Sequence, residues 1–380
     1  MSKRVLIDGR LLGYRYGGIA TYARQLARHT PVVARGMEIR LLAARDIPEF
    51  SDRVQRALTP PHHRFERAAL GLEVMARKPD LLHSVDYVQP ILCRGVKSVV
   101  TVHDVAFLNN PDLVTPDSYR YYIQALETLP GADRIIAVSQ STRDQLLEST
   151  SIDPTQVVVV PNGYDDDVFR PDAGPDVDRR TLSKRDRTLA QAIDAGRPIV
   201  LAVGTIEPRK RYDILFDAFE QHFDRITELA GAEPLLVVAG QVGWLAEESI
   251  VKLRRLLHCN RAIWARDVRD QELAALYRSA QLLAMPSAEE GFGLPALEAM
   301  ASGTPSLIAD LNAVKEIIAD NGFLEESADP ARWAEKIARI LADREIRERR
   351  SRRGIERASE FTWRETARRT VGVYRSVLDE

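Results

Sequence analysis

The sequence predicts an α/β protein made of two Rossmann-like, doubly wound halves. At 380 residues the chain is long enough for two domains of ordinary size. Short runs rich in Val, Ile and Leu alternate with longer helical segments from one end to the other. This alternation is typical of parallel sheets covered on both faces. A polar stretch at 162–187 separates two sets of such runs, so the same plan occurs twice.

The apolar runs give the expected strands of each half. In the first half they are 4–8, 38–43, 80–84, 98–102, 134–138 and 156–161. In the second half they are 198–204, 234–240, 262–265, 280–286, 304–310 and 322–324. We expect the first domain to span 1–170, a linker 171–196 and the second domain 197–361. From about residue 330 the tail is predicted to be helical, with one buried face formed by Trp333, Ile337, Ile340 and Leu341.

Composition and charge exclude several classes of protein. The sequence is 45% hydrophobic and 28% charged, and no stretch approaches the roughly 20 apolar residues of a membrane span. No secretory signal is recognisable at the start, so we expect a cytoplasmic protein. A net charge of −2 argues against a nucleic-acid partner. Cys93 and Cys259 are too far apart for a Cys-x-x-Cys motif, and we interpret both as small core residues.

Two candidate sites follow strands of the first half, because ligands of open α/β sheets bind beyond the carboxyl ends of the strands. Gly17 and Gly18 open a helix, and a glycine pair lets the backbone approach a phosphate at a helix N-terminus. A plain turn is the alternative. His103 follows the strand at 98–102, where a neutral imidazole oriented by Asp104 can bind a hydroxyl or a phosphate. The alternative is a histidine packed against its own loop.

The second half has cations after its first strand. Arg209 and Lys210 are adjacent in the loop that follows 198–204. Adjacent cations suit a diphosphate, because each donates hydrogen bonds and neutralises the charge that builds on a leaving group. An exposed basic turn is the alternative.

Two carboxylates, Glu290 and Glu298, flank a glycine-rich loop after the strand at 280–286. We expect a short helix over 295–302 that ends before Gly303. Carboxylates accept hydrogen bonds from vicinal diols, and amides at a helix start suit phosphate. Together these features favour a nucleotide sugar. A glycosidase acid and nucleophile pair would leave the phosphate-type features on the other strands unexplained.

Several motifs resemble those of one family. "EEGFGLPALEAMASGTP" and "GTIEPRKRYDILFDAF" are similar to the second domain of the retaining glycosyltransferases of family 4, and "GGIATYARQL" and "VVTVHDVAFL" are similar to the first. The resemblance covers nearly the whole chain. It implies the GT-B fold, with two Rossmann-like domains facing across a cleft and a C-terminal helix at about 362–380 that crosses back to the first domain.

The resemblance also implies an activity. The family transfers a sugar, here a hexose, from a nucleotide diphosphate sugar to a hydroxyl of a saccharide or lipid-linked acceptor. The anomeric configuration is retained, and neither a metal ion nor a cofactor is needed. Mannosyl transfer in cell-surface polysaccharide synthesis is one such reaction. Matched to the motifs, the catalytic candidates are Lys210, Arg209, Glu290 and His103, and the donor-binding candidates are Gly17, Gly18, Thr205, Val268, Phe292, Gly293, Leu294 and Glu298.

The resemblance gives individual roles to these side chains. Glu298 would hold the donor ribose and Glu290 the transferred sugar. Arg209 and Lys210 would bind the diphosphate, and His103 would contact the donor sugar. This chain departs from many members in one respect, since it has Gly204, Thr205 and Ile206 where they carry an additional arginine. Main chain near Val268 is expected to contact the base.

Other functions and partners remain open. A nucleotide-sugar epimerase, a sugar phosphorylase or a non-catalytic nucleotide-sugar-binding protein could have the same architecture. A dehydrogenase is disfavoured, because neither half has a Gly-x-Gly-x-x-Gly turn in place. The basic, amphipathic segment 53–78 could make a peripheral contact with the inner face of the membrane, or could be a surface helix with ordinary salt bridges. The donor base and sugar are not specified.

Overall fold

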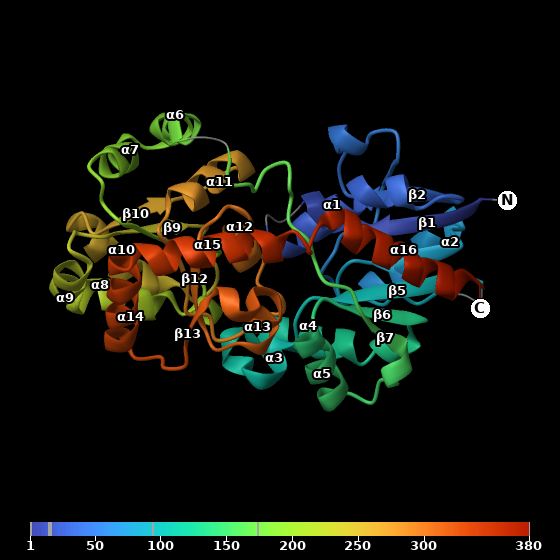
Figure 1. Ribbon diagram of the computed structural model, residues 1–380. Helices are drawn as coiled ribbons and strands as arrows, with labels where there is room; N and C mark the ends of the chain where they lie inside the picture. Colours follow the sequence, from blue (N-terminus) through green and yellow to red (C-terminus); the bar gives the residue numbers. More distant parts are fainter. Residues whose placement is uncertain (1, 14–16, 93–94, 173–174, 380) are drawn as a thin grey trace. The chain divides into compact units, whose positions relative to one another are not determined.

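The chain forms two compact units. The computed structural model describes residues 2–13, 17–92, 95–172 and 175–379 (Figure 1). Unit 1 comprises Met1–Gly163 and Phe361–Glu380, and unit 2 comprises Tyr164–Glu360. Each unit has its own sheet, and all paired strands of both sheets are parallel. The predicted class of two doubly wound parallel-sheet domains is confirmed.

Unit 1 has its strands in the order β3-β2-β1-β4-β5-β6-β7. Its strands are β1 Lys3–Asp8, β2 Met37–Ala43, β3 Val54–Arg56, β4 Leu81–Ser84, β5 Lys97–Val102, β6 Arg134–Ala137 and β7 Val157–Val159. Its helices are α1 Gly18–Val33, α2 Glu66–Arg77, α3 Ala106–Asn109, α4 Pro116–Leu126, α5 Gln140–Ser149 and α16 Trp363–Asp379. The last of these returns from the far end of the chain and packs against α1 (Figure 1).

Unit 2 has the order β10-β9-β8-β11-β12-β13. Its strands are β8 Ile199–Val203, β9 Leu235–Ala239, β10 Ala262–Ala265, β11 Leu282–Met285, β12 Ser306–Ala309 and β13 Phe323–Glu325. Its helices are α6 Pro175–Arg185, α7 Arg187–Asp194, α8 Tyr212–Gln221, α9 Phe223–Ala230, α10 Glu247–His258, α11 Asp270–Ser279, α12 Leu294–Ala301, α13 Asn312–Ile318, α14 Pro330–Ala342 and α15 Arg344–Ala358.

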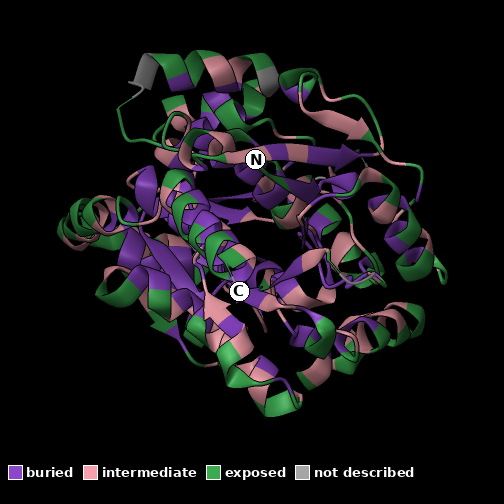
Figure 2. Ribbon diagram, turned by 90° about the vertical axis from the view of Figure 1, so that its right-hand side faces the viewer, coloured by how far each residue is buried: buried purple, intermediate pink, exposed green. Residues whose placement is uncertain are grey.

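Burial follows the apolar patterns of the sequence. The strands are largely buried, whereas most helices alternate between buried and exposed residues (Figure 2). On α14, the expected stripe of Trp333, Ile337, Ile340 and Leu341 is buried. In the described part of the chain, no helix is both long enough and apolar enough to span a membrane.

The structure differs from the expected plan in three places. The expected linker at 171–196 contains α6 and α7, which belong to unit 2, and the buried Asp178 of α6 pairs with Arg278 of α11 at 2.7 Å. The short β3 was not expected, because Val54–Arg56 is only half-buried and carries a polar and a charged residue. The interpretation of Cys259 as a core residue is wrong, since its thiol is exposed at the end of α10. Cys93 lies outside the described residues.

The basic segment 53–78 forms β3, a loop and α2. It keeps three large apolar side chains exposed, namely Leu58, Phe65 and Leu72. The guanidinium of Arg64 lies over the Phe65 ring, 4.4 Å from its centroid.

A buried polar network fastens α16 to the sheet of unit 1. His83 of β4 is fully buried and contacts the Tyr374 hydroxyl through Nδ1 at 2.7 Å and the Thr101 hydroxyl through Nε2 at 2.8 Å. The Tyr22 hydroxyl of α1 also contacts Thr101 Oγ1, at 3.0 Å. Burial lowers the pKa of His83 to about 3, so the ring is neutral at neutral pH and needs partners for both nitrogens.

Tyr374→Phe is therefore expected to destabilise unit 1. The variant keeps the ring but leaves His83 Nδ1 without its described partner, and an unsatisfied buried polar group costs about 1–3 kcal/mol. Differential scanning calorimetry measures the loss. The matched control is Ser376→Ala on the exposed face of the same helix, which should change stability by less than about 0.5 kcal/mol. Equal melting temperatures for Tyr374→Phe and the parent would contradict the role of this bond.

Candidate functional site

The candidate site of unit 2 lies where the strand order reverses. From β8 the chain first proceeds outward to β9 and β10 and then returns to place β11 on the other side of β8. The loops after β8 and β11 therefore leave neighbouring strands in opposite directions. In open α/β sheets this reversal is where ligands bind.

Arg209 joins these two loops. It lies in a 3₁₀ helix, Pro208–Lys210, within the loop that follows β8. Its guanidinium donates to Glu207 Oε1 at 3.1 Å and to the Glu289 carbonyl at 3.2 Å. Its own carbonyl accepts from the Ala288 amide at 2.8 Å. The expected exposed alternative does not hold, because Arg209 is only 22% exposed at its side chain and is tied to both loops.

Lys210 and Glu290 form the central ion pair of the site. Lys210 Nζ donates to Glu290 Oε1 at 2.6 Å, and the Ser287 hydroxyl donates to the same oxygen at 2.8 Å. The side chains are 10% and 7% exposed. Burial alone would raise the pKa of Glu290, but the charges of Lys210 and Arg209 outweigh it and hold the pKa below its ordinary value. Glu290 is thus a carboxylate at neutral pH.

The glycine-rich loop ends at the start of α12. Gly293 precedes Leu294, the first residue of the helix, with a φ of 98°, which is strained for other residues. A Cβ on Gly293 would also come within 2.9 Å of a methyl group of Val314. The amides of Phe292, Gly293 and Leu294 lie at the N-terminus of α12, where the helix dipole favours an anion.

Glu298 lies further along α12 and has its own partner. Its Oε2 accepts a hydrogen bond from the Tyr277 hydroxyl of α11 at 3.0 Å. Burial raises the pKa of Glu298 to about 8, against the opposing bond from Tyr277 and with the help of Asp270 and Asp165. The described partners of Glu298 include no cation. Hydroxyl donors of a ligand would therefore stabilise its ionised form.

The two carboxylates are connected through tyrosines rather than by direct contact. The Tyr212 hydroxyl donates to the Gly204 carbonyl at 3.2 Å, at the end of β8. Burial raises the pKa of Tyr212, and Glu290 adds to this effect. Burial likewise raises the pKa of Tyr277, with contributions from Glu298 and Tyr212. Glu290 and Glu298 therefore belong to one electrostatic cluster.

Thr205 and Val268 occupy the same edge of the sheet. Thr205 follows β8, and the amide of its neighbour Ile206 donates to the Gln241 carbonyl at 2.8 Å. Gln241 also hydrogen-bonds through its side chain to Asp267, which precedes Val268. The loops after β8, β9 and β10 are therefore joined at Gln241, although the described bonds do not link Val268 to Lys210 or Glu290.

The remaining predicted residues lie in unit 1. Gly17 precedes α1 with a φ of 150°, and Gly18 is its first residue. His103 Nε2 donates to the Val85 carbonyl at 2.8 Å, which fixes the tautomer, and burial lowers the pKa of His103. Its Nδ1 is therefore an acceptor at neutral pH. The expectation that Asp104 orients His103 is wrong, since Asp104 Oδ1 accepts from the Ala106 amide at 3.2 Å instead.

Sequence reasoning missed several polar residues of these sites. Ser287 lies two residues after the end of β11, so the rule applied to the other strand ends could have found it. No local pattern identifies Tyr277, which is 21 positions from Glu298 and lies on another helix. Elsewhere in unit 1, the buried ion pair of Arg10 with Glu66 was also missed, and it spans 56 positions.

Comparison with protein families assigns both units. Residues 185–357 match the family described as "Glycosyl transferases group 1". Residues 16–168 match the family described as "Glycosyltransferase Family 4".

Curated relatives agree with this assignment. A D-inositol 3-phosphate glycosyltransferase of Frankia alni is 32% identical over 75% of this chain and 69% of that protein. A protein of the same name from Nocardioides sp. is 32% identical over 75% of this chain and 63% of its own length. The match thus spans somewhat less than two thirds of the Nocardioides protein.

Solved glycosyltransferase structures have the same fold. The Anabaena protein HepE, crystallised with UDP and glucose, aligns with a TM-score of 0.74 at 18% identity, covering 99% of this chain and 100% of that one. Sucrose-phosphate synthase from Thermosynechococcus elongatus aligns with a TM-score of 0.75 at 20% identity, covering 99% of both chains.

Lys210→Met should destabilise unit 2 in a pH-dependent way. The change leaves Glu290 buried without its nearest cation, and breaking a buried ion pair costs about 3–5 kcal/mol. In the parent the pKa of Glu290 is lowered, so the pair stabilises the fold above the unfolded carboxyl pKa and less as the pH falls. The deficit of the variant should therefore be large at pH 8 and shrink toward pH 4, as measured by scanning calorimetry.

The matched control is Lys252→Met, which breaks another lysine–carboxylate pair of unit 2. Lys252 and Asp217 lie 2.7 Å apart but are 17% and 19% exposed. Their loss should cost about 1 kcal/mol or less. A deficit of Lys210→Met that does not exceed the control, or that does not change with pH, would refute the central role of the pair.

Proposed function

Because the chain belongs to the group 1 glycosyl transferases of glycosyltransferase family 4, we propose that it transfers a hexose from a nucleotide diphosphate sugar to a hydroxyl group of an acceptor. The observation that carries the proposal is the pairing of Lys210 and Arg209 with Glu290 at the strand reversal of unit 2. The cations suited to an anion and the carboxylate suited to hydroxyl groups are in contact there. A nucleotide diphosphate sugar needs both within one molecule.

Lys210 and Arg209 are suited to the diphosphate. An ammonium group has three N–H donors, and the bond to Glu290 uses one of them. Glu207 and Glu290 balance the two cations before the donor binds. The incoming diphosphate would therefore share or replace carboxylate contacts, which keeps the cations desolvated and oriented in advance. The backbone amides at the start of α12 are further hydrogen-bond donors for the diphosphate, and they are uncharged.

Glu290 is suited to hold the transferred sugar rather than to attack it. A nucleophilic carboxylate must give electron density to the anomeric carbon, whereas two cations and the Ser287 hydroxyl stabilise the charge of Glu290. We therefore propose a front-face reaction without a covalent intermediate. The acceptor oxygen forms its bond to the anomeric carbon on the face from which the diphosphate leaves, and the departing phosphate oxygen takes the acceptor proton.

Unit 1 would provide the remaining donor contacts. By family resemblance we assign Gly17 and Gly18 to the diphosphate and His103 to the donor sugar. The neutral His103 ring supports this assignment, because its Nδ1 can accept a hydrogen bond from a sugar hydroxyl. The names of the relatives make D-inositol 3-phosphate one acceptor to test, beside free and lipid-linked saccharides.

Transfer with retention is the result expected of the direct test. A thermal-shift screen of nucleoside diphosphates and their hexoses first identifies the donor, because a ligand of the native state raises its melting temperature. NMR then follows the anomeric proton of the product formed with saccharide acceptors. We expect a product of the donor's configuration, and the same rate with a chelator present.

Three outcomes of this test separate the rivals. Release of an isomerised donor without an acceptor would indicate an epimerase, and a requirement for inorganic phosphate would indicate a phosphorylase. Donor binding without turnover would indicate a binding protein. To test the role of Lys210 in the reaction, kcat of the variant Lys210→Ala is measured, and it should be lower by about 10²- to 10³-fold. An inverted product would refute the front-face reaction.

Nucleotide affinity should rise with pH up to about 8. Burial raises the pKa of Glu298 to about 8, and a ribose diol is best bound by the ionised carboxyl, which offers only acceptors. Binding must then release a proton below that pH, so Kd should fall by about fivefold between pH 7 and 8. Calorimetric titration measures this. Glu298→Gln should bind more weakly and without the dependence, and an identical pH profile in that variant would contradict the ribose role.

A further inference from the structure

Helix α2 of unit 1 presents an apolar side to the outside of the protein. Its large members are Phe65, the residue before the helix, and Leu72, and both are exposed. Residues spaced by three and four positions share one side of a helix. By this spacing the smaller, exposed or half-buried members are Ala68, Ala69, Met75 and Ala76. The other side of α2, with Leu70 and Val74, packs into a core cluster of unit 1.

Two further apolar residues are fixed beside α2. The Leu58 amide donates to Glu73 Oε1 at 2.7 Å. The Ile91 amide donates to the Arg67 carbonyl at 3.1 Å, and Gly71 permits this approach, because a Cβ there would clash with the Ile91 carbonyl oxygen. Four of the five most exposed large apolar side chains in the described part of the chain therefore form one surface, which we call the α2 face: Leu58, Phe65, Leu72 and Ile91.

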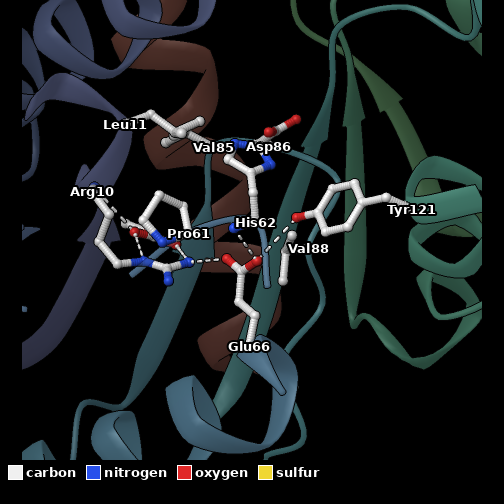
Figure 3. Close-up of a pocket in the computed structure, with 10 residues that line it drawn as sticks. Arg10, Leu11, Pro61, His62, Glu66, Val85, Asp86, Val88 and Tyr121 are labelled. Carbon is white, nitrogen blue, oxygen red and sulfur yellow. Dashed lines mark hydrogen bonds and ion pairs between the residues drawn. The ribbon is translucent and has the colours of Figure 1, made fainter. Parts of the chain in front are cut away.

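Both carboxylates of the segment 53–78 are buried and bonded inside unit 1. Glu66 Oε1 accepts from Arg10, which follows β1 at the strand reversal of this unit, at 2.8 Å. Figure 3 shows Glu66 extending from its helix to Arg10 and to the Tyr121 hydroxyl. The two oxygens of Glu73 accept backbone amides at 2.7 and 2.8 Å. The segment therefore offers no carboxylate to a partner.

The cations of the same segment are directed the other way. Four of them are exposed, namely Arg56, Arg64, Arg67 and Lys78. Among the described residues, none of these four forms an ion pair, and the Arg67 Nε donates to the Gln89 carbonyl instead. The alternative of a surface helix with ordinary salt bridges thus accounts only for Arg53, paired with Asp52, and Arg77, paired with Glu73. The α2 face is apolar and bordered by cations.

Charge separates the partners that could cover this face. A twofold contact between two copies would pair the patch with itself and bring the same cations together, which is unfavourable. A bilayer with anionic lipids offers the opposite charge at its surface and an apolar layer just beneath it. Helices that lie in this interface have large apolar side chains flanked by lysine and arginine. The α2 face has this composition.

We propose that the α2 face docks on the surface of a bilayer that contains anionic phospholipids. Leu58, Phe65 and Leu72 enter the boundary between headgroups and acyl chains. Arg64, Arg67 and Lys78 contact the headgroups. This inference goes beyond the proposed transferase function, because it concerns where the protein binds and holds for any donor.

Vesicle sedimentation of the full-length protein tests the proposal. The vesicles consist of phosphatidylcholine alone or of an equal mixture with phosphatidylglycerol. We expect the partition coefficient to be about tenfold or more higher for the anionic vesicles, because each cation near such a surface adds to binding. It should fall as salt is added, since salt screens the headgroup charge. Equal partition into both kinds of vesicle, or no binding to either, overturns the proposal.

Two pairs of substitutions assign the binding to the α2 face. Phe65→Ser with Leu72→Ser should lower the partition coefficient by about tenfold or more, because large apolar side chains no longer leave water. Arg64→Gln with Lys78→Gln should lower it by about fivefold per charge, and only for anionic vesicles.

Matched controls change exposed residues elsewhere. Val32→Ser with Val251→Ser removes two exposed apolar side chains of α1 and α10, and Lys184→Gln removes an exposed cation of α6. The controls should bind vesicles like the parent. All variants should keep the melting temperature of the parent, because the changed side chains are exposed. Variants of the α2 face that bind like the controls overturn the proposal.

Light scattering and donor binding distinguish the remaining outcomes. A parent that is a dimer without vesicles, and a monomer once Phe65 and Leu72 are replaced, would assign the face to a second copy and overturn the proposal. A parent that binds vesicles but is stabilised by no nucleotide sugar loses only the transferase function. A parent that is stabilised by a nucleotide sugar but ignores anionic vesicles loses only the docking surface.

Discussion

The reversal of strand order beside β8 is the constraint on which the site of unit 2 depends. A parallel sheet places the carboxyl ends of all its strands at one edge, and only at the reversal do two adjacent loops diverge and leave backbone groups uncovered. Arg209 and Lys210 follow β8, whereas Ser287 and Glu290 follow β11 on the adjacent strand. Lys210 and Glu290, 80 positions apart in the chain, therefore form a contact of 2.6 Å because they follow adjacent strands.

Charge balance determines what this site can do. An isolated buried lysine would lose its proton, and an isolated buried glutamate would gain one, because burial penalises the charged form of both. The charges of Lys210 and Arg209 lower the pKa of Glu290, so this carboxylate stays charged beside them. Glu298 shows the contrary case. Burial raises its pKa to about 8, and no cation among its described partners opposes this effect. Hydroxyl donors from a bound ligand would favour the charged form.

The sequence was sufficient for what local patterns encode. Strands such as Ile199–Val203 are short, largely buried apolar runs, and the predicted candidates Lys210 and Glu290 lie in the loops that follow β8 and β11. It was insufficient where tertiary contacts decide. Helix α6 has a weak apolar pattern, and its Asp178 is anchored by an ion pair to Arg278, 100 positions away. The pairing of Arg10 with Glu66 likewise joins segments whose local sequences carry no sign of each other.

Both strand reversals of this protein pair cations with carboxylates, but the N–H donors of the cations are used differently. In unit 2 the ammonium of Lys210 gives one of its three N–H groups to Glu290. In unit 1 the guanidinium of Arg10 is 2% exposed and every N–H has an acceptor inside the protein. If only the types of the paired residues were compared, the two sites would look equivalent. The use of donors separates the two sites, because the described bonds of Arg10 use all of its N–H groups inside the protein, whereas the described bonds of Lys210 use one of three, as the proposed binding of a diphosphate requires.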